Sequence, residues 1–176
     1  ALVLEAFQQV LPGTTGQLVY FISHNIARKE IVNNRPNWVH RKGATRAFPA
    51  GHHALRTTPF ADTGHPILLP GDPCSGSVVM VAAEGAEKSC FSVNHGSGRM
   101  LGRKQAKRTL DQAQVDQQFE TNDVLTNCRR YPVDEAPAAY KDFNEVLKSV
   151  KAAGLATEVA RLRARFVIKD ASDADD

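Results

Sequence analysis

A histidine followed by two glycines and two arginines is the part of this sequence best suited to phosphate chemistry. His95 stands before Gly96 and Gly98, and Arg99 and Arg103 come soon after. Glycines let a backbone approach a phosphate closely, because no Cβ stands in the way. An imidazole nitrogen here can attack phosphorus and form a phosphoramidate. The alternative is a glycine turn with a surface histidine, since glycine motifs are common by chance.

The elements that must position these residues follow from hydrophobic periodicity and from turn residues. An apolar run at 17–23 reads as a buried strand, with a helix as the alternative, and it ends at His24-Asn25. The expected fold is α+β: strands of a mixed sheet followed by a helical segment. The expected strands are 38–42, 67–69, 77–82, 89–93 and 165–169, and the expected helices are 1–12, 102–110, 113–120, 138–153 and a short one near 157. A long polar loop at 43–66 is expected to be functional, because structureless loops of that length are rare in compact domains.

Composition bounds the class of protein. The chain has 176 residues, 42% of them hydrophobic and 23% charged, which suits one domain with its own core over 1–176. No apolar run reaches eighteen residues, so no membrane partner is expected. The residues 171–176 are acidic and predict a disordered tail. Three widely spaced cysteines, most of them expected to be buried, and no C-x-x-C pair indicate a reduced, cytoplasmic setting.

Three separated motifs then occur in a fixed order. They are Asn37-Trp-Val-His-Arg-Lys-Gly-Ala-Thr-Arg-Ala-Phe48, His95-Gly-Ser-Gly-Arg99 and Asp134-Glu-Ala-Pro-Ala-Ala-Tyr-Lys141. From about Val19 to Asp170, the chain resembles the C-terminal part of the RtcB-type RNA ligases. The members of that family are about twice as long or longer, so the resemblance implies that an N-terminal portion is missing here.

The resemblance implies an enzyme that uses GTP and Mn²⁺. His95 would attack GTP and carry GMP covalently. The GMP would pass to the 3′-phosphate of an RNA end, which can itself come from a 2′,3′-cyclic phosphate. The 5′-hydroxyl of the second RNA end would then attack this phosphate and expel the GMP. The expected partners are RNA ends, such as tRNA halves in splicing or broken RNA in repair, and the missing N-terminal portion. The rest of the metal ligands would come from that portion, so the fragment alone is expected to be inactive.

Individual roles carry over by position. His24, in the setting His24-Asn-Ile-Ala27, matches a manganese ligand, which suits the preference of Mn²⁺ for imidazole and carboxylate. Arg99 and Arg103 match residues near the RNA ends, and Arg41 and Lys42 belong to a basic motif that is expected to contact RNA. The residues expected to bind the nucleotide are Asn25, Pro70, Gly71, Asp72, Pro73, Ser77, Gly96, Ser97, Gly98, Tyr140 and Lys169. For Tyr140, a purely structural place in the core is an equally open alternative. For Arg99 and Arg103, the alternative is a salt bridge within the protein.

The sequence departs from the family in the loop 70–77. Asp72 replaces a usual hydroxyl residue near the nucleotide phosphates, and Pro73 and Cys74 also replace usual residues. A carboxylate at that place would repel a triphosphate unless a metal or a base compensates. We therefore expect weakened guanylylation of His95. The alternative function is an inactive, non-catalytic nucleotide- or RNA-binding fragment that lacks the N-terminal metal ligands.

Overall fold

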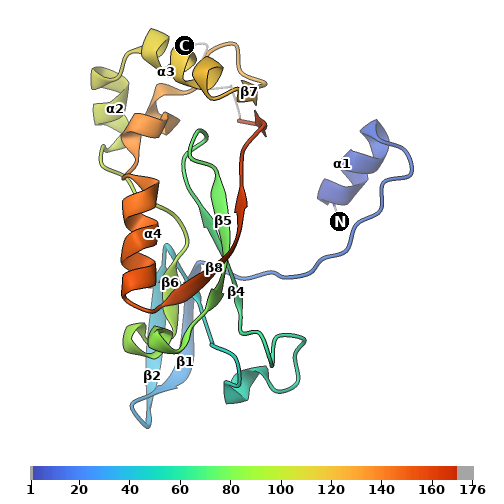
Figure 1. The fold of residues 1–176 in the computed structure, drawn as a ribbon, viewed down its shortest axis with the longest axis vertical. Coiled ribbons are helices and arrows are strands. Elements are labelled where there is room, and N and C mark those ends of the chain that lie inside the picture. The colour runs from blue at the N-terminus through green and yellow to red at the C-terminus, as the bar shows by residue number, and fades with distance from the viewer. Residues whose placement is uncertain (1, 170–176) are drawn as a thin grey trace.

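The computed structural model describes residues 2–169 and is drawn in Figure 1. Helices and strands alternate irregularly, and the sheets are small. This confirms the α+β fold, although a helix precedes the first strand and strands also follow the later helices, so the chain is not simply strands followed by helices. None of the helices between residues 2 and 169 is both long and apolar enough to cross a membrane. The predicted disordered tail, 171–176, lies outside the described residues.

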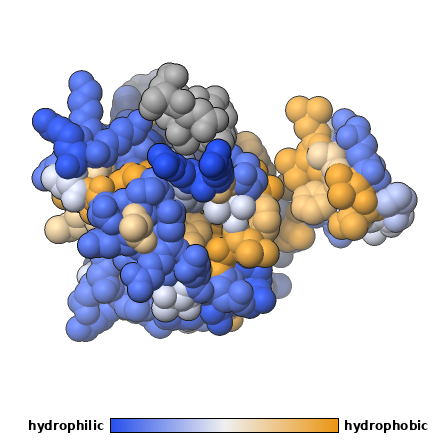
Figure 2. Space-filling model, turned by 90° about the horizontal axis from the view of Figure 1, so that it is seen from above, coloured by the Kyte–Doolittle hydropathy of each residue, from blue (hydrophilic) through white to orange (hydrophobic). Residues whose placement is uncertain are grey.

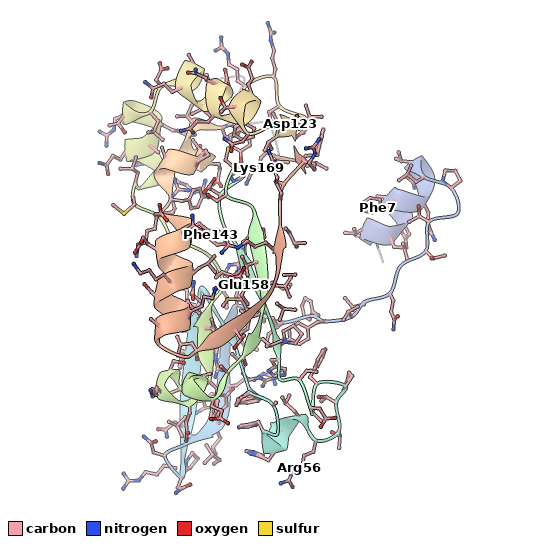
Figure 3. All side chains as sticks on the ribbon, viewed as in Figure 1. Phe7, Arg56, Asp123, Phe143, Glu158 and Lys169 are labelled. Carbon is pink, nitrogen blue, oxygen red and sulfur yellow. The ribbon has the colours of Figure 1, made fainter. Side chains whose placement is uncertain are left out.

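The largest sheet is antiparallel, in the order β4-β5-β8. Its strands are β4 (Pro66–Pro70), β5 (Ser77–Ala82) and β8 (Ala156–Leu162). Along β5, buried and half-buried residues alternate, as a two-residue pleat with one covered face requires. Helix α4 (Phe143–Ala152) covers that face, and Phe143 projects from it toward the sheet (Figure 3). The core between them contains Ile67, Leu69, Val78, Met80, Phe143, Leu147 and Val150.

Two antiparallel strand pairs lie below this sheet in the view of Figure 1. The hairpin β1 (Asn25–Val32) and β2 (Arg35–Lys42) turns through Asn33 and Asn34, which both have positive φ. Asparagine tolerates this left-handed backbone better than most residues, which suits it to a two-residue hairpin turn. The second pair joins β3 (Ala44–Arg46) to β6 (Ser92–Asn94). Strand β6 delivers His95 at its end.

The helical end of the molecule has its own small core. Helices α2 (Arg103–Thr109) and α3 (Gln112–Thr121) lie there, with the parallel strands β7 (Leu125–Thr126) and β9 (Phe166–Val167). The 3₁₀ turns η3 (Val133–Glu135) and η4 (Pro137–Ala139) also belong to this part of the chain, whereas η1 (His53–Leu55) lies in the loop between β3 and β4 and η2 (Glu84–Ser89) contacts β6. The buried cluster comprises Val115, Phe119, Val124, Tyr131 and Ala136.

The apolar run 17–23 does not form the predicted strand. The chain there is extended but pairs with no other described strand, and Leu18, Val19 and Phe21 are exposed. It belongs to an N-terminal arm, residues 2–23, whose helix α1 (Leu2–Val10) stands away from the body (Figure 1), while Tyr20 packs on Phe60 where the arm enters the body. Figure 2 shows the apolar side chains of this arm at a distance from the body. Periodicity revealed the apolar character of the run, but a strand also needs a partner.

One predicted helix was wrong in part and another was wrong entirely. The helix expected over 138–153 begins only at Phe143, because Pro137 opens a 3₁₀ turn and Asp142 caps the true helix by accepting a hydrogen bond from the N–H of Glu145 at 3.0 Å. The short helix expected near Thr157 is instead part of β8, where pairing with β5 determines the conformation. The long loop 43–66 contains β3 and η1, so it is less irregular than expected.

Candidate active site

His95 and His24 come together although they are far apart in the sequence. The N–H of His95 donates to the carbonyl of Gly43 at 3.1 Å, and the N–H of Gly43 donates to the carbonyl of His24 at 2.9 Å. The two imidazole rings stack, with centroids 3.9 Å apart and planes inclined by 24°. The turn between β2 and β3 therefore ties together the ends of β1 and β6 that carry the predicted nucleophile and the predicted metal ligand.

The surroundings favour the neutral form of His95. Partial burial lowers the pKa of His95 below its usual value, and the neighbouring His24 adds to the effect. A neutral imidazole keeps a lone pair on one nitrogen, which nucleophilic attack requires. At neutral pH the His95 side chain is therefore in the protonation state that phosphoryl chemistry needs.

The glycine loop after His95 lies beside the loop that follows β4. A Cβ placed on Gly96 would lie 3.8 Å from the carbonyl oxygen of Pro70, an ordinary contact distance, so the two loops are neighbours. The side-chain amide of Asn94 donates to the carbonyl of Gly96 at 2.8 Å and fixes the start of the loop. Gly98 has φ +74°, a conformation that suits glycine, while Ser97 is buried. The loop therefore offers backbone groups rather than the Ser97 side chain.

Asp72 turns into its own loop. Its Oδ1 accepts hydrogen bonds from the N–H groups of Cys74 at 2.9 Å and Ser75 at 3.0 Å, and its Oδ2 accepts from the hydroxyl of Ser75. Three donors thus compensate the charge of this buried carboxylate. The repulsion expected from the sequence does not follow from this geometry, because the carboxylate is held by the loop itself.

A pocket of about 210 Å³ opens between this loop and the helical end of the molecule. Tyr140 and Lys169, both predicted to bind a nucleotide, line it together with Glu135 and Tyr131, which we had not predicted. Lys169 lies at the helical end in Figure 3. The predicted loop residues on its wall are Gly71, Asp72, Pro73 and Ser77. The structure thus gathers most of the predicted nucleotide residues in one place.

Glu135 organises the polar wall of this pocket. It accepts a hydrogen bond from the Tyr140 hydroxyl at 2.6 Å and from Lys169 Nζ at 3.4 Å, and it pairs with Arg103. Burial acts to raise the pKa of Glu135, but the Tyr140 hydrogen bond and the charges of Lys169 and Arg103 outweigh it and hold the pKa below its usual range. The carboxylate is therefore ionised, and its oxygens can accept hydrogen bonds from the N–H groups of a nucleobase. Its place in the third sequence motif was the signal that could have identified it.

The two arginines of the glycine motif differ in availability. Arg99 donates to the carbonyls of Leu101 and Asp134 and to the Tyr140 hydroxyl, and its guanidinium lies 5.0 Å from the centre of the Tyr140 ring. Arg103 pairs with Asp134 at 2.8 Å, yet its side chain is 64% exposed. The salt-bridge alternative thus describes both residues in this structure, and Arg103 keeps a surface that can meet a phosphate.

Arg41 does not have the predicted RNA-facing position. It is 3% exposed, and its guanidinium donates to both carboxylate oxygens of Glu30 at 2.8 and 2.7 Å. It also donates to Ser92 Oγ and to the carbonyl of Cys90, both at 3.0 Å. Adjacent residues of a strand point to opposite faces, so Arg41 faces inward while Lys42 is exposed. Arg41 therefore braces the β1–β2 hairpin against β6.

Asn25, also predicted to bind the nucleotide, has a local role. Its Oδ1 accepts a hydrogen bond from the N–H of Gly43 at 3.4 Å, the same residue that links His24 to His95.

All three cysteines are free, and only Cys128 is buried, which is fewer than the sequence predicted.

A metal was expected at His24. Among residues 2–169, no group of three or more His, Cys, Asp or Glu side chains comes close enough to hold a metal ion. The described residues therefore offer single donors, with His24 among them, rather than a complete site.

Comparison with known proteins shows the family to which the chain belongs. The family model described as tRNA-splicing ligase RtcB matches residues 1–170. The tRNA-splicing ligase RtcB of Pyrococcus horikoshii is 39% identical over 173 residues, which cover 94% of this chain and 20% of that protein. The corresponding protein of Aeropyrum pernix is 37% identical, covering 94% of this chain and 36% of the relative. The RNA-splicing ligase RtcB of Mycobacterium tuberculosis is 37% identical, covering 92% and 39%. The chain spans between a fifth and two fifths of these relatives, and it belongs to the RtcB family of RNA-splicing ligases.

Proposed function

We propose that this chain is the part of a GTP- and manganese-dependent RNA ligase that carries the nucleophile, His95. The observation that carries the proposal is the position of His95. It lies at the end of β6, stacked on His24, with its pKa lowered toward the neutral form, and the glycine loop that follows it lies beside the loop after β4. Membership of a family whose members are named tRNA-splicing or RNA-splicing ligases supports this reading.

The proposed chemistry proceeds in three steps. A nitrogen of His95 attacks the α-phosphorus of GTP, so that an N–P bond forms and the bond to the pyrophosphate oxygen breaks. An oxygen of an RNA 3′-phosphate then attacks the same phosphorus and releases His95. Finally, the 5′-hydroxyl of a second RNA attacks the 3′-phosphate, forms the phosphodiester and expels GMP. A bound Mn²⁺ would neutralise phosphate charge in these steps.

The pocket around Glu135 is the proposed guanine site. The ionised carboxylate accepts from the N–H donors of guanine, and Tyr140 supplies an aromatic wall. Lys169 adds a positive charge at its edge. Arg103 and Lys42, which are exposed, are the proposed contacts to RNA phosphates.

A non-catalytic nucleotide- or RNA-binding role remains the second candidate for residues 1–176 taken alone. It is favoured by the fact that no three-donor metal group forms among residues 2–169. We propose that the ligase activity needs a further portion of an RtcB polypeptide, that its substrates are tRNA halves or broken RNA ends, and that the reaction takes place in the cytoplasm.

The test is RNA joining with defined ends. The longest reading frame that contains residues 1–176 should join an RNA with a 3′-phosphate or a 2′,3′-cyclic phosphate to one with a 5′-hydroxyl, in the presence of GTP and Mn²⁺. Substrates with a 3′-hydroxyl and a 5′-phosphate are the matched control and should not be joined. His95→Asn should abolish joining, and residues 1–176 alone should not join RNA. Joining that survives His95→Asn would contradict the proposal.

A further inference from the structure

A second pocket, of about 290 Å³, lies where the N-terminal arm enters the body. Its wall is formed by the segment 20–23, just before His24, and by side chains of the hairpin β1–β2 and of β3. It shares no lining residue with the pocket at Glu135. Nothing in the proposed roles of His95, Glu135 or Arg103 uses it.

The charge in this pocket is positive and incompletely balanced. Arg28, Arg41 and Arg46 line it, and none of its lining residues within the described chain is acidic. The nearby carboxylate of Glu30 is occupied by the bidentate bond from Arg41, and Arg46 lies 3.9 Å from it. Arg28 is exposed at the rim. Among residues 2–169, at least one guanidinium charge of this pocket therefore has no counter-ion.

Two buried donors in the same pocket have no acceptor. The Nε of Arg46 and the hydroxyl of Tyr20 are both buried, and neither finds a hydrogen-bond partner among residues 2–169. Buried polar groups of folded proteins are nearly always paired, so two orphaned donors in one cavity call for an acceptor from outside the chain. Burial is the largest cause that lowers the pKa of Arg46, followed by the charge of Arg28, which an anion would relieve.

We propose that this pocket binds a phosphate oxyanion between Arg28, Arg46 and Tyr20. A guanidinium offers fork-shaped donors that match phosphate oxygens, and the tyrosine hydroxyl supplies one more donor. The source that the geometry favours is a backbone phosphate of RNA, because the pocket wall continues directly into His24 and the stacked His95. Phe21, which is 80% exposed on the same wall, offers a ring on which a neighbouring base can stack. The RNA source, but not the oxyanion chemistry, rests on the proposed function.

The first test measures binding of a single-stranded RNA oligonucleotide to residues 1–176 by fluorescence anisotropy across a salt series. Arg28→Ala should weaken binding roughly tenfold at low salt, as expected for the loss of a charged hydrogen bond. It should also reduce the slope of log K against log salt by about 0.7, the value for one phosphate contact on a single strand. Lys29→Ala is the matched control, because it removes the same charge one residue away on the opposite face of β1. It should change neither quantity.

The second test uses inorganic phosphate, with sodium chloride at equal ionic strength as the reference. Phosphate should raise the thermal unfolding midpoint of the wild-type chain, and this rise should be lost in Arg28→Ala and reduced in Tyr20→Phe. In chloride, Tyr20→Phe should not lower the midpoint, since it removes a hydroxyl that has no partner. A purely structural role for the hydroxyl would lower the midpoint equally in both salts and would contradict the proposal.

The two tests separate the possible sources of the oxyanion. If phosphate acts through Arg28 while RNA affinity is unchanged in Arg28→Ala, the pocket is a site for free phosphate and RNA is not its source. If Arg28→Ala and Lys29→Ala behave alike in both measurements, the proposal is wrong. Neither measurement involves GTP or His95, so a failure of the proposed ligase chemistry would leave this result intact.

Discussion

Replacing Asp72 by alanine tests whether this carboxylate holds its loop or faces the nucleotide. In the structure it accepts two backbone hydrogen bonds, at 2.9 and 3.0 Å, and one from the hydroxyl of Ser75. A hydrogen bond to a charged group contributes about 1.5–3 kcal/mol. The donor Ser75 is exposed, so water replaces part of what is lost. We therefore expect Asp72→Ala to lower the free energy of unfolding by about 2 kcal/mol, within the range for loss of a capping carboxylate.

Urea denaturation followed by circular dichroism measures this loss as a shift in midpoint at constant slope. Asp72→Asn is the matched variant, because its carbonyl oxygen still accepts from the two backbone N–H groups, while the charge and the acceptor for the Ser75 hydroxyl are lost. It should fall between the wild type and Asp72→Ala. Equal stability of Asp72→Ala and the wild type would refute the capping role.

A different substitution at the same position tests the expected weakening of His95 guanylylation. At an effective dielectric near 20, like charges about 4 Å apart repel by roughly 4 kcal/mol, which would slow the reaction of His95 strongly. With the carboxylate held by its loop, Asp72→Ser should not accelerate labelling of His95 by GTP. An acceleration of tenfold or more would show that Asp72 faces the phosphates after all.

Three further predictions concern pH, a buried arginine and a close backbone approach. Burial, with smaller effects from nearby cationic groups, lowers the pKa of His65 to about 4. The stability that goes with a neutral His65 is complete above the unfolded-state pKa of about 6.5 and is lost as the pH falls toward 4. The free energy of unfolding should therefore drop by about 3 kcal/mol over that window, and by less in His65→Asn, as urea denaturation at each pH would show. Arg41→Ala should destabilise the chain by about 3 kcal/mol, because the carboxylate of Glu30 loses its bidentate partner and keeps only Arg46, at 3.9 Å. The exposed neighbour variant Lys42→Ala should stay within about 0.5 kcal/mol, and equal effects would contradict the bracing role. A Cβ on Gly76 would overlap the carbonyl oxygen of Leu162, so Gly76→Ala should lower the free energy of unfolding by more than about 3 kcal/mol. Gly51→Ala, with φ +74° but nothing within 4 Å, should lower it by about 1 kcal/mol. Similar midpoints of the two variants in thermal unfolding would show that the backbone relaxes freely.

Strong local patterns predicted their elements well. Strand β5 has the bounds expected from its apolar run, and α2 begins one residue after the expected start. The turn chemistry around Pro137 was underestimated, so α4 starts later than expected. Thr157 lies in a strand because β5 provides a partner for it, which local sequence does not reveal.

For the site, the order of motifs identified more than the residue types did. His95 was predicted to be the nucleophile and His24 a metal ligand, and the structure stacks their rings. Arg41 and Lys42 could not be separated by composition, because only the pleat of β2 decides which one faces inward. The carboxylate of Glu135 became visible only when Tyr140, Lys169 and the loop 70–77 were placed around it.

The most direct measurement of the central claim is covalent labelling of His95. The longest reading frame that contains residues 1–176 would be incubated with GTP radiolabelled at the α-phosphate and with Mn²⁺, and the labelled peptide would be mapped by mass spectrometry. The account predicts one GMP on His95, through a bond that is labile in acid and stable in base, as a phosphoramidate is. A label that persists in His95→Ala, or one that maps to a serine as a phosphate ester, would contradict it.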